Sequence, residues 1–129
     1  MAAQINVASR NAQLTAFGTR YAAATLTIYS GTMPSTVDDS LSGNTALAVH
    51  TLAGFAAAAS ASMAASAIAD VAMAATGTAT FARLVAGAET AQMTVGTSGA
   101  DIIVDSTAYI AGNTSKINSL TVTQARNVT

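Results

Sequence analysis

The sequence contains no cysteine and no tryptophan, and it has only one proline. The absence of cysteine excludes disulfide bonds, thiolate metal sites and cysteine nucleophiles together. Aromatic residues make up only 5% of the 129 residues, although hydrophobic residues reach 51% because alanine is abundant. A single domain of this length can bury enough surface to fold without disulfides or metals, but we expect a thin core of small side chains.

Charged residues are also scarce, at 9% of the chain against a typical value of about 25%. The five lysines and arginines are scattered, whereas nucleic-acid binding needs a basic patch, so we expect no nucleic-acid partner. The N-terminal residues lack the basic start and apolar run of a signal peptide. The longest apolar run, residues 52–75, is interrupted by serines and by Asp70, so we expect no membrane-spanning helix. Low charge suits a protein that packs against other proteins.

Residues 1–24 differ from the rest and are expected to form an N-terminal arm or short helix. Ser9 is a suitable cap for a helix over residues 10–20, which would place Leu14 and Phe17 on one face. The alternative is an extended arm, led by apolar residues near its start, that becomes ordered only on a partner. The candidate interface residues in this part of the chain are Gln4, Ile5 and Val7.

The remainder, residues 25–129, is expected to be a single β-sandwich domain. Short runs of alternating apolar and polar residues recur between clusters of glycine, serine, asparagine and aspartate. This spacing predicts a mainly β fold, an antiparallel β-sandwich or a jelly-roll-like barrel, with the short N-terminal helix or arm attached. The apolar residues expected to share a strand face are Leu26 and Ile28, Leu47 and Val49, Ala79, Phe81 and Val85, Met93 and Val95, Ile102 and Val104, and Leu120 and Val122.

The alanine-rich residues 53–75 are the least regular part of the pattern. Alanine is the best helix former, but the larger apolar residues here form no clean helical stripe. Serines and glycine-flanked ends divide the segment into pieces. We predict two or three short strands, whose small side chains would let sheets or neighbouring subunits approach closely.

Few residues are candidates for chemistry. His50 is the only histidine, and a role as a base or pH switch competes with the favoured interpretation as a structural or surface residue. Asp38 and Asp39 could bind a cation, although a solvated turn is favoured. A Gly-x-Ser-x-Gly nucleophile elbow is absent from the sequence. We therefore expect no enzyme activity, no catalytic residues, no cofactor and no bound metal.

The glycine-rich stretch GTSGADIIVDST at residues 96–107 invites comparison with phosphate- and calcium-binding loops. No lysine follows its glycines, as a P-loop requires, and apolar residues stand where an EF-hand needs oxygen ligands. It is therefore interpreted as a turn followed by a strand, with Asp101 and Asp105 facing outward. Arg83 is expected either at the rim of the sheet or paired with one of these aspartates. These residues, Arg83, Asp101 and Asp105, complete the candidate interface set.

Three motifs occur in one order along the chain: LTIYSGTMP at residues 26–34, GTATFARL at 77–84 and GTSGADIIVDST at 96–107. Together they resemble a family of small β-rich proteins encoded in the structural modules of tailed bacteriophages and prophages. The resemblance covers about residues 25–123. Two positions depart from the family pattern: Thr27 stands where the family often has arginine, and Phe81 where it often has tryptophan.

The resemblance implies a structural role in the virion, and we expect a capsid decoration, or cement, protein that bridges capsid subunits from outside the shell. Such a protein would be made in the host cytoplasm and would bind the major capsid protein or other virion proteins, with homo-oligomerisation as a further option. It would bind neither nucleic acid nor membrane. One alternative is a structural protein of the neck, tail or fibre base. The other is a lectin-like module with glycans stacking on aromatic residues such as Tyr21, Tyr29 and Tyr109.

Overall fold

The computed structural model describes residues 3–124 and 127–128, which form one helix and twelve short or medium strands. Strands take up 44% of the chain and helix 11%, which confirms the prediction of a mainly β fold with a short N-terminal helix. The elements are β1 (Ala3–Gln4), α1 (Val7–Arg20), β2 (Thr25–Ser30), β3 (Ala46–Thr51), β4 (Ser62–Ala64), β5 (Val71–Ala72), β6 (Gly77–Ala86), β7 (Glu89–Gly96), β8 (Ile102–Val104), β9 (Ala108–Tyr109), β10 (Thr114–Ser115), β11 (Ile117–Thr123) and β12 (Asn127–Val128).

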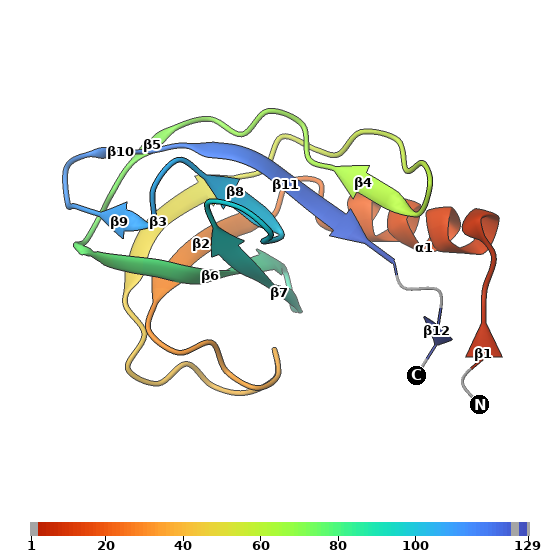
Figure 1. The fold of residues 1–129 in the computed structure, drawn as a ribbon, viewed down its shortest axis with the longest axis horizontal. Helices are drawn as coiled ribbons and strands as arrows, with labels where there is room; N and C mark the ends of the chain where they lie inside the picture. The colour runs from red at the N-terminus through yellow and green to blue at the C-terminus, as the bar shows by residue number, and fades with distance from the viewer. Residues whose placement is uncertain (1–2, 125–126, 129) are drawn as a thin grey trace.

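Most strands belong to one sheet with the order β3-β2-β6-β7-β8-β11-β4, and β9 pairs with β6 beside this path. Neighbouring strands of the path are antiparallel except β7 and β8, which are parallel. The sheet curls strongly into an open half-barrel (Figure 1). Two small ribbons, β1–β12 and β5–β10, lie outside the path.

The core lies on one face of the central strands. Leu26 and Ile28 of β2 are fully buried, as the alternation predicts. They pair with Leu84 and Ala82 of β6, which are also buried. Burying each large aliphatic side chain stabilises a fold by about 1.5–3 kcal/mol, so these cross-strand rows account for much of the stability of the sheet.

A bulge in β3 changes the predicted pattern of that strand. Leu47 is an extra residue between those paired with Ile28 and Tyr29. Leu47 and the following Ala48 are therefore both buried, whereas Val49 is 49% exposed. The prediction that Leu47 and Val49 share a buried face is wrong, because a bulge adds a residue and reverses the faces that follow.

A second irregularity in β6 has the same consequence. Phe81 pairs with Tyr29 and Ala79 pairs with Ser30, so Thr80 is an extra residue on β6 at this point. The register shift places Ala79 and Phe81 on opposite faces of the sheet. Ala79 joins the central core, but Phe81 faces the opposite side of the sheet together with Val85, which is 42% exposed. The prediction of one shared face is correct for Phe81 and Val85 and wrong for Ala79.

Helix α1 begins three residues earlier than predicted. Asn6, not Ser9, is its N-cap, and the Asn6 Oδ1 accepts a hydrogen bond from the Ser9 backbone N–H at 2.9 Å. Both residue types cap helices well, so local sequence does not separate the two positions. Leu14 and Gly18 are buried. A Cβ on Gly18 would lie 3.0 Å from the Met63 Sδ, so the missing side chain lets the helix lie close to β4 (Figure 1).

The alanine-rich segment forms the two short strands β4 and β5, which confirms the prediction, and otherwise runs along the sheet edges. The Ala56 N–H donates to the Ala64 carbonyl at 2.8 Å beside β4. The Ala74 N–H donates to the Leu47 carbonyl at 2.7 Å beside β3. These backbone contacts occupy hydrogen-bonding groups that an uncovered edge strand would offer to another chain.

Candidate functional site

The loop between β2 and β3, residues 31–45, is the longest connection between consecutive helices or strands of the described chain. The sequence predicts a loop here from its glycine, proline, serine and aspartate residues. Loops of this length without regular structure are usually either functional or disordered. Side chains of the sheet anchor this β2–β3 loop in a defined position, which makes it the candidate interaction site.

An aromatic pair occupies the sheet face on the loop side. The rings of Tyr29 and Phe81 stack with their centroids 5.3 Å apart and an interplanar angle of 19°. Phe81 is completely buried although it lies outside the central core cluster. We infer that the β2–β3 loop covers it, because the loop bonds to Arg83, two residues further along β6 on the same face.

Arg83 and Gln92, paired across β6 and β7, hold the middle of the loop. The Arg83 Nη2 donates to the Asp39 carbonyl at 2.8 Å, and its Nε donates to the Gln92 Oε1 at 3.0 Å. The Gln92 Nε2 then donates to the Pro34 carbonyl at 3.0 Å. One connected set of side chains therefore fixes two well-separated points of the loop.

Two further side chains fix the ends of the loop. The Thr80 hydroxyl donates to the Gly31 carbonyl at 2.6 Å. The Asn44 side-chain amide donates to the carbonyls of Ser30 and Thr32, at 2.9 and 3.0 Å. Since these acceptors are backbone carbonyls, the anchors set the path of the chain and leave most loop side chains available for a partner. A loop ordered in advance loses less entropy on binding.

The outer surface of the loop is polar with one apolar projection. Met33 is 39% exposed beside a shallow hollow of about 320 Å³ lined mainly by hydroxyl and amide side chains. Asp38 and Asp39 are exposed, and the Asp39 carboxylate accepts a hydrogen bond from the Thr36 N–H at 3.1 Å, as a solvated turn requires. This surface offers contacts for recognition rather than an activated nucleophile or base.

The structure does not bring Arg83 to the predicted aspartates. The Asp101 carboxylate instead accepts hydrogen bonds from the backbone and hydroxyl of Thr94, at 3.2 and 3.3 Å, and closes the glycine turn. The Asp105 carboxylate accepts a hydrogen bond from the Asn118 amide. The predicted pairing is therefore wrong, because Arg83 is satisfied by Gln92 and by a loop carbonyl that carries no sequence signature.

The N-terminal candidates lie together at the start of α1. Gln4 belongs to β1, which pairs with β12, and the remaining residues 1–2 of the expected arm lie outside the described part of the chain. Ile5 is half-buried and Val7 is 45% exposed. These residues and Arg10 line an open hollow of about 410 Å³. The residues that line this hollow are far in sequence from the β2–β3 loop, and no described contact joins them to the loop.

His50 lies in a buried polar cluster, in line with the structural interpretation. Its Nδ1 is 3.0 Å from the Ala69 carbonyl oxygen, and its Nε2 is 2.8 Å from the Ser115 Oγ. The Ser115 Oγ is in turn 3.1 Å from the Tyr109 hydroxyl. Burial lowers the pKa of His50 and raises the pKa of Tyr109. His50 is 1% exposed and Ser115 is fully buried, so no substrate reaches this serine–histidine pair.

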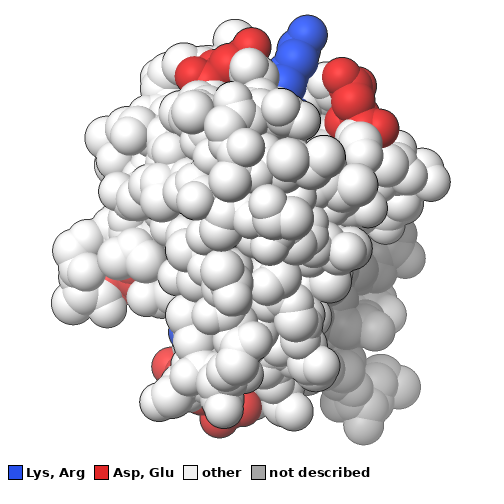
Figure 2. Space-filling view, turned by 90° about the vertical axis from the view of Figure 1, so that its left-hand side faces the viewer, with Lys and Arg blue, Asp and Glu red and all other residues white. Residues whose placement is uncertain are grey.

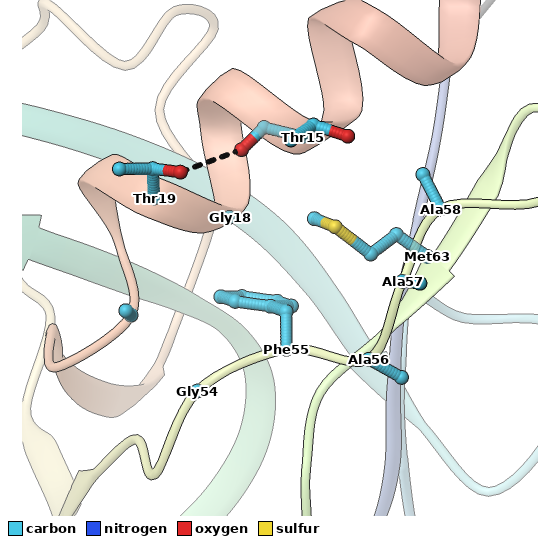
Figure 3. Close-up of a pocket in the computed structure, with 10 residues that line it drawn as sticks. Thr15, Gly18, Thr19, Gly54, Phe55, Ala56, Ala57, Ala58 and Met63 are labelled. Carbon is cyan, nitrogen blue, oxygen red and sulfur yellow. Dashed lines mark hydrogen bonds between the residues drawn. The ribbon is translucent and has the colours of Figure 1, made fainter.

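A hollow of about 350 Å³ lies between α1 and residues 54–58 (Figure 3). The side chains of Phe55 and Met63 point toward the helix there. The hydroxyls of Thr15 and Thr19 bond back to helix carbonyls, at 2.9 and 3.0 Å. The lining is therefore mostly apolar and small, with no side chain suited to catalysis.

Within the described residues, no three histidine, aspartate or glutamate side chains gather closely enough to hold a metal ion. The same part of the chain contains no helix long and apolar enough to cross a membrane. The β2–β3 loop, fixed by the sheet and exposed on its outer side, is thus the best-defined candidate site. The chain matches no family model, no curated protein and no solved structure.

Proposed function

We propose that this chain is a structural protein of a tailed-bacteriophage virion and acts as a capsid decoration protein. In this role it binds the outer surface of the shell, with the major capsid protein as its main partner, and bridges neighbouring capsid subunits. It is made in the host cytoplasm and then resides on the virion, and it is not an enzyme. The observation that carries the proposal is the ordered set of three sequence motifs.

The three motifs form one contiguous unit, which supports the idea that they are a functional signature. LTIYSGTMP comprises β2 and the first loop residues, GTATFARL comprises most of β6, and the third motif begins at the end of β7 and contains β8. These strands are neighbours in the sheet. Two motif residues, Thr80 and Arg83, anchor the β2–β3 loop. We assign this loop as the contact with the capsid.

The surface composition also supports assembly with other proteins. Figure 2 shows one face of the molecule that is largely uncharged, with acidic and basic groups mainly at its upper and lower edges. Protein interfaces are depleted in charge at their centres. Many copies acting together on a shell need only modest affinity each.

The lectin-like alternative is disfavoured by the positions of the tyrosines. Tyr21 and Tyr109 are 7% and 2% exposed, and Tyr29 is half-buried with its ring stacked on Phe81. A sugar needs an exposed aromatic face for stacking; Tyr21 and Tyr109 offer none, and the stacking with Phe81 occupies one face of Tyr29. A position at the neck, tail or fibre base remains the competing virion location.

Quantitative mass spectrometry of purified virions that carry this protein tests the proposal. A decoration protein should be present at a copy number comparable with that of the major capsid protein. A copy number that matches the tail proteins would replace the capsid location with the neck or tail. Absence from washed virions would overturn the proposed function.

The loop assignment has its own test. Replacing residues 35–41 by two glycines should weaken binding to undecorated capsids at least tenfold, roughly the effect of losing 1.4 kcal/mol of contact energy. Ser119→Ala, an exposed residue of β11 outside both the loop and the three motifs, is the control and should bind normally. Unchanged capsid binding by the loop variant, with native circular dichroism, would exclude the loop as the contact.

A further inference from the structure

The ribbon formed by β5 and β10 covers the free edge of strand β3. This β5–β10 ribbon comprises residues 69–75 and 113–115, with Ala72 opposite Thr114 and Val71 opposite Ser115. β3 is the last strand of the main sheet on this side. Isolated two-stranded ribbons are at best marginally stable in water, so contacts with β3, such as the Ala74 N–H bond to the Leu47 carbonyl, help to hold this one in place.

His50 provides the side-chain contacts between the two. It projects from β3 and reaches both halves of the ribbon: the Ala69 carbonyl ahead of β5 at 3.0 Å and the Ser115 hydroxyl of β10 at 2.8 Å. Beyond Ser115 lies the hydroxyl of Tyr109 on β9, which pairs with β6. A single imidazole thus joins β3 to the ribbon on two sides.

Only one protonation state of the imidazole satisfies this geometry. A carbonyl oxygen can only accept, so Nδ1 carries the proton that it donates to Ala69. Nε2 is then the acceptor for the Ser115 hydroxyl, whose single proton is used in this bond. The Ser115 and Tyr109 hydroxyl oxygens are 3.1 Å apart, and because the Ser115 proton is already used, we infer that Tyr109 donates in this pair and that the hydrogen bonds run from Tyr109 to Ala69.

A second proton on His50 disrupts this arrangement. Nε2 becomes a donor, the Ser115 hydroxyl must turn its proton toward Tyr109, and the Tyr109 hydroxyl then loses the Ser115 oxygen as an acceptor. The positive charge would also be buried, since His50, Ser115 and Tyr109 are all at most 2% exposed. Burying an ionised group without a partner is strongly unfavourable. The neighbouring groups do not remove this cost: Leu26, opposite on β2, is apolar, and the charged Asp70 and Lys116 are exposed.

We propose that His50 is an acid-sensitive latch, which holds the β5–β10 ribbon on the edge of β3 while it is neutral and releases the ribbon when it is protonated. Opening exposes the backbone groups of an edge strand, which can then pair with another chain. This regulatory role does not depend on the virion assignment.

The direction of the pH effect follows from the burial of His50. Burial lowers the pKa of the imidazole in the closed state, outweighing the opposite effects of the Ala69 carbonyl and then of Asp70. In the open state the pKa returns to about 6.5. The latch is therefore complete above about pH 6.5 and weakens as the pH falls from there toward the lower pKa of the closed state.

Nuclear magnetic resonance of the imidazole tests the protonation state directly, because the chain has one histidine and the signals are unambiguous. The proposal expects a neutral ring protonated at Nδ1 and a titration midpoint below that of a free histidine. Ser115→Ala removes the donor to Nε2 and should raise the midpoint. Ser119→Ala, an exposed serine on β11, should leave it unchanged. An Nε2-protonated ring, or an ordinary midpoint in the wild-type protein, would overturn the latch.

Hydrogen exchange tests whether the ribbon opens. The amides of Met73 and Ala74 are bonded to Asn113 and Leu47, and their protection factors should fall by up to about tenfold per pH unit below pH 6.5. The amide of Leu84 in β6 is the internal control and should keep its protection. His50→Gln should remove the pH dependence of the ribbon amides. If that variant does not fold, Ser115→Ala, which raises the closed-state pKa toward that of the open state, should narrow the pH range over which protection is lost and make the total loss smaller. Unchanged pH dependence in either folded variant would contradict the proposal.

Discussion

The central strands and the alanine-rich connection are stabilised in different ways. β2, β6 and β7 are six to ten residues long and bury large side chains such as Leu26, Ile28 and Leu84 almost completely. The connection over residues 53–75 contains strands of only two and three residues, and most of its alanines are exposed. Its few larger side chains, such as Phe55 and Met63, pack against the helix or the core, and its alanines connect to the sheet mainly through backbone hydrogen bonds.

This difference shows that one chain can build its centre from rows of large apolar side chains and its edges mainly from backbone hydrogen bonds, with few large side chains. An alanine methyl buries little apolar area, so its removal changes little, at about 0.8 kcal/mol for each buried carbon group. The small side chain lets a backbone approach a sheet edge closely enough to pair with it. We therefore expect side-chain truncation to be damaging in the centre, and the edges to depend on a few polar residues.

Leu84→Ala should have the largest effect. Leu84 is 1% exposed and lies in the middle of β6, so its truncation should lower the free energy of unfolding by about 2–5 kcal/mol. The measurement is urea denaturation followed by circular dichroism. Val85→Ala, one residue away and 42% exposed, should change the unfolding free energy far less. Equal losses in the two variants would show that burial of large side chains is not what stabilises the central strands.

Asn11→Ala tests the polar support of the alanine-rich connection. The Asn11 Oδ1 accepts a hydrogen bond from the Ala61 N–H at 2.9 Å, and Ala61 is buried. Leaving this amide unpaired should cost about 1–2 kcal/mol. Thermal unfolding would report the loss, with Gln13→Ala on the exposed side of α1 as the control. A loss no greater than that of the control would show that the turn around Ala61 does not depend on this hydrogen bond.

Ser60→Asn should stabilise the same turn. Ser60 and Ala61 link Ala59 and Ser62 and have φ values of 52° and 59°, which few residues other than glycine and asparagine adopt easily. Asparagine should raise the unfolding free energy by up to about 1 kcal/mol, measured by urea denaturation. Thr51→Asn, an exposed residue without positive φ, is not expected to stabilise and serves as the comparison. A destabilised Ser60→Asn variant would contradict the strain argument.

Arg20→Ala should have the smallest effect. Arg20 forms an ion pair with Glu89, and the two side chains are 63% and 41% exposed. Water screens such pairs, so we expect a change below about 0.5 kcal/mol in the unfolding free energy. Raising the salt concentration should have little effect on the difference between wild type and variant. A loss of unfolding free energy as large as that of Asn11→Ala would show that the Arg20–Glu89 ion pair contributes substantially to stability.

The sequence pattern predicts the fold class and the central strand β2 well, because Leu26 and Ile28 alternate with polar residues through a regular ladder. It fails for Val49 and Ala79, since the irregularities at Leu47 and Thr80 arise from pairing with β2. A bulge depends on two strands at once and leaves no mark in either sequence alone.

The candidate site was only partly predictable. The glycine, proline and aspartate residues of the β2–β3 loop identify a loop, and the sequence pattern marks Arg83 as an unusual residue for a strand. Its acceptors could not be predicted, because one is a backbone carbonyl and the other, Gln92, becomes a neighbour only when β6 pairs with β7. The link between His50 and Ser115 joins residues far apart in the chain for the same reason.

The hairpin of β6 and β7 has a consequence for the order of folding. Ala86 pairs with Glu89 across a two-residue turn, and Gly87 has the positive φ of 62° that such turns favour. This is a local contact, whereas β2 must find β6 across a long intervening segment. Local contacts close with a small entropy loss, so we expect the hairpin to form first and to template β2. The half-barrel would then grow from its longest hairpin outward, and its alanine-covered edges would be the last to become protected from aggregation during synthesis.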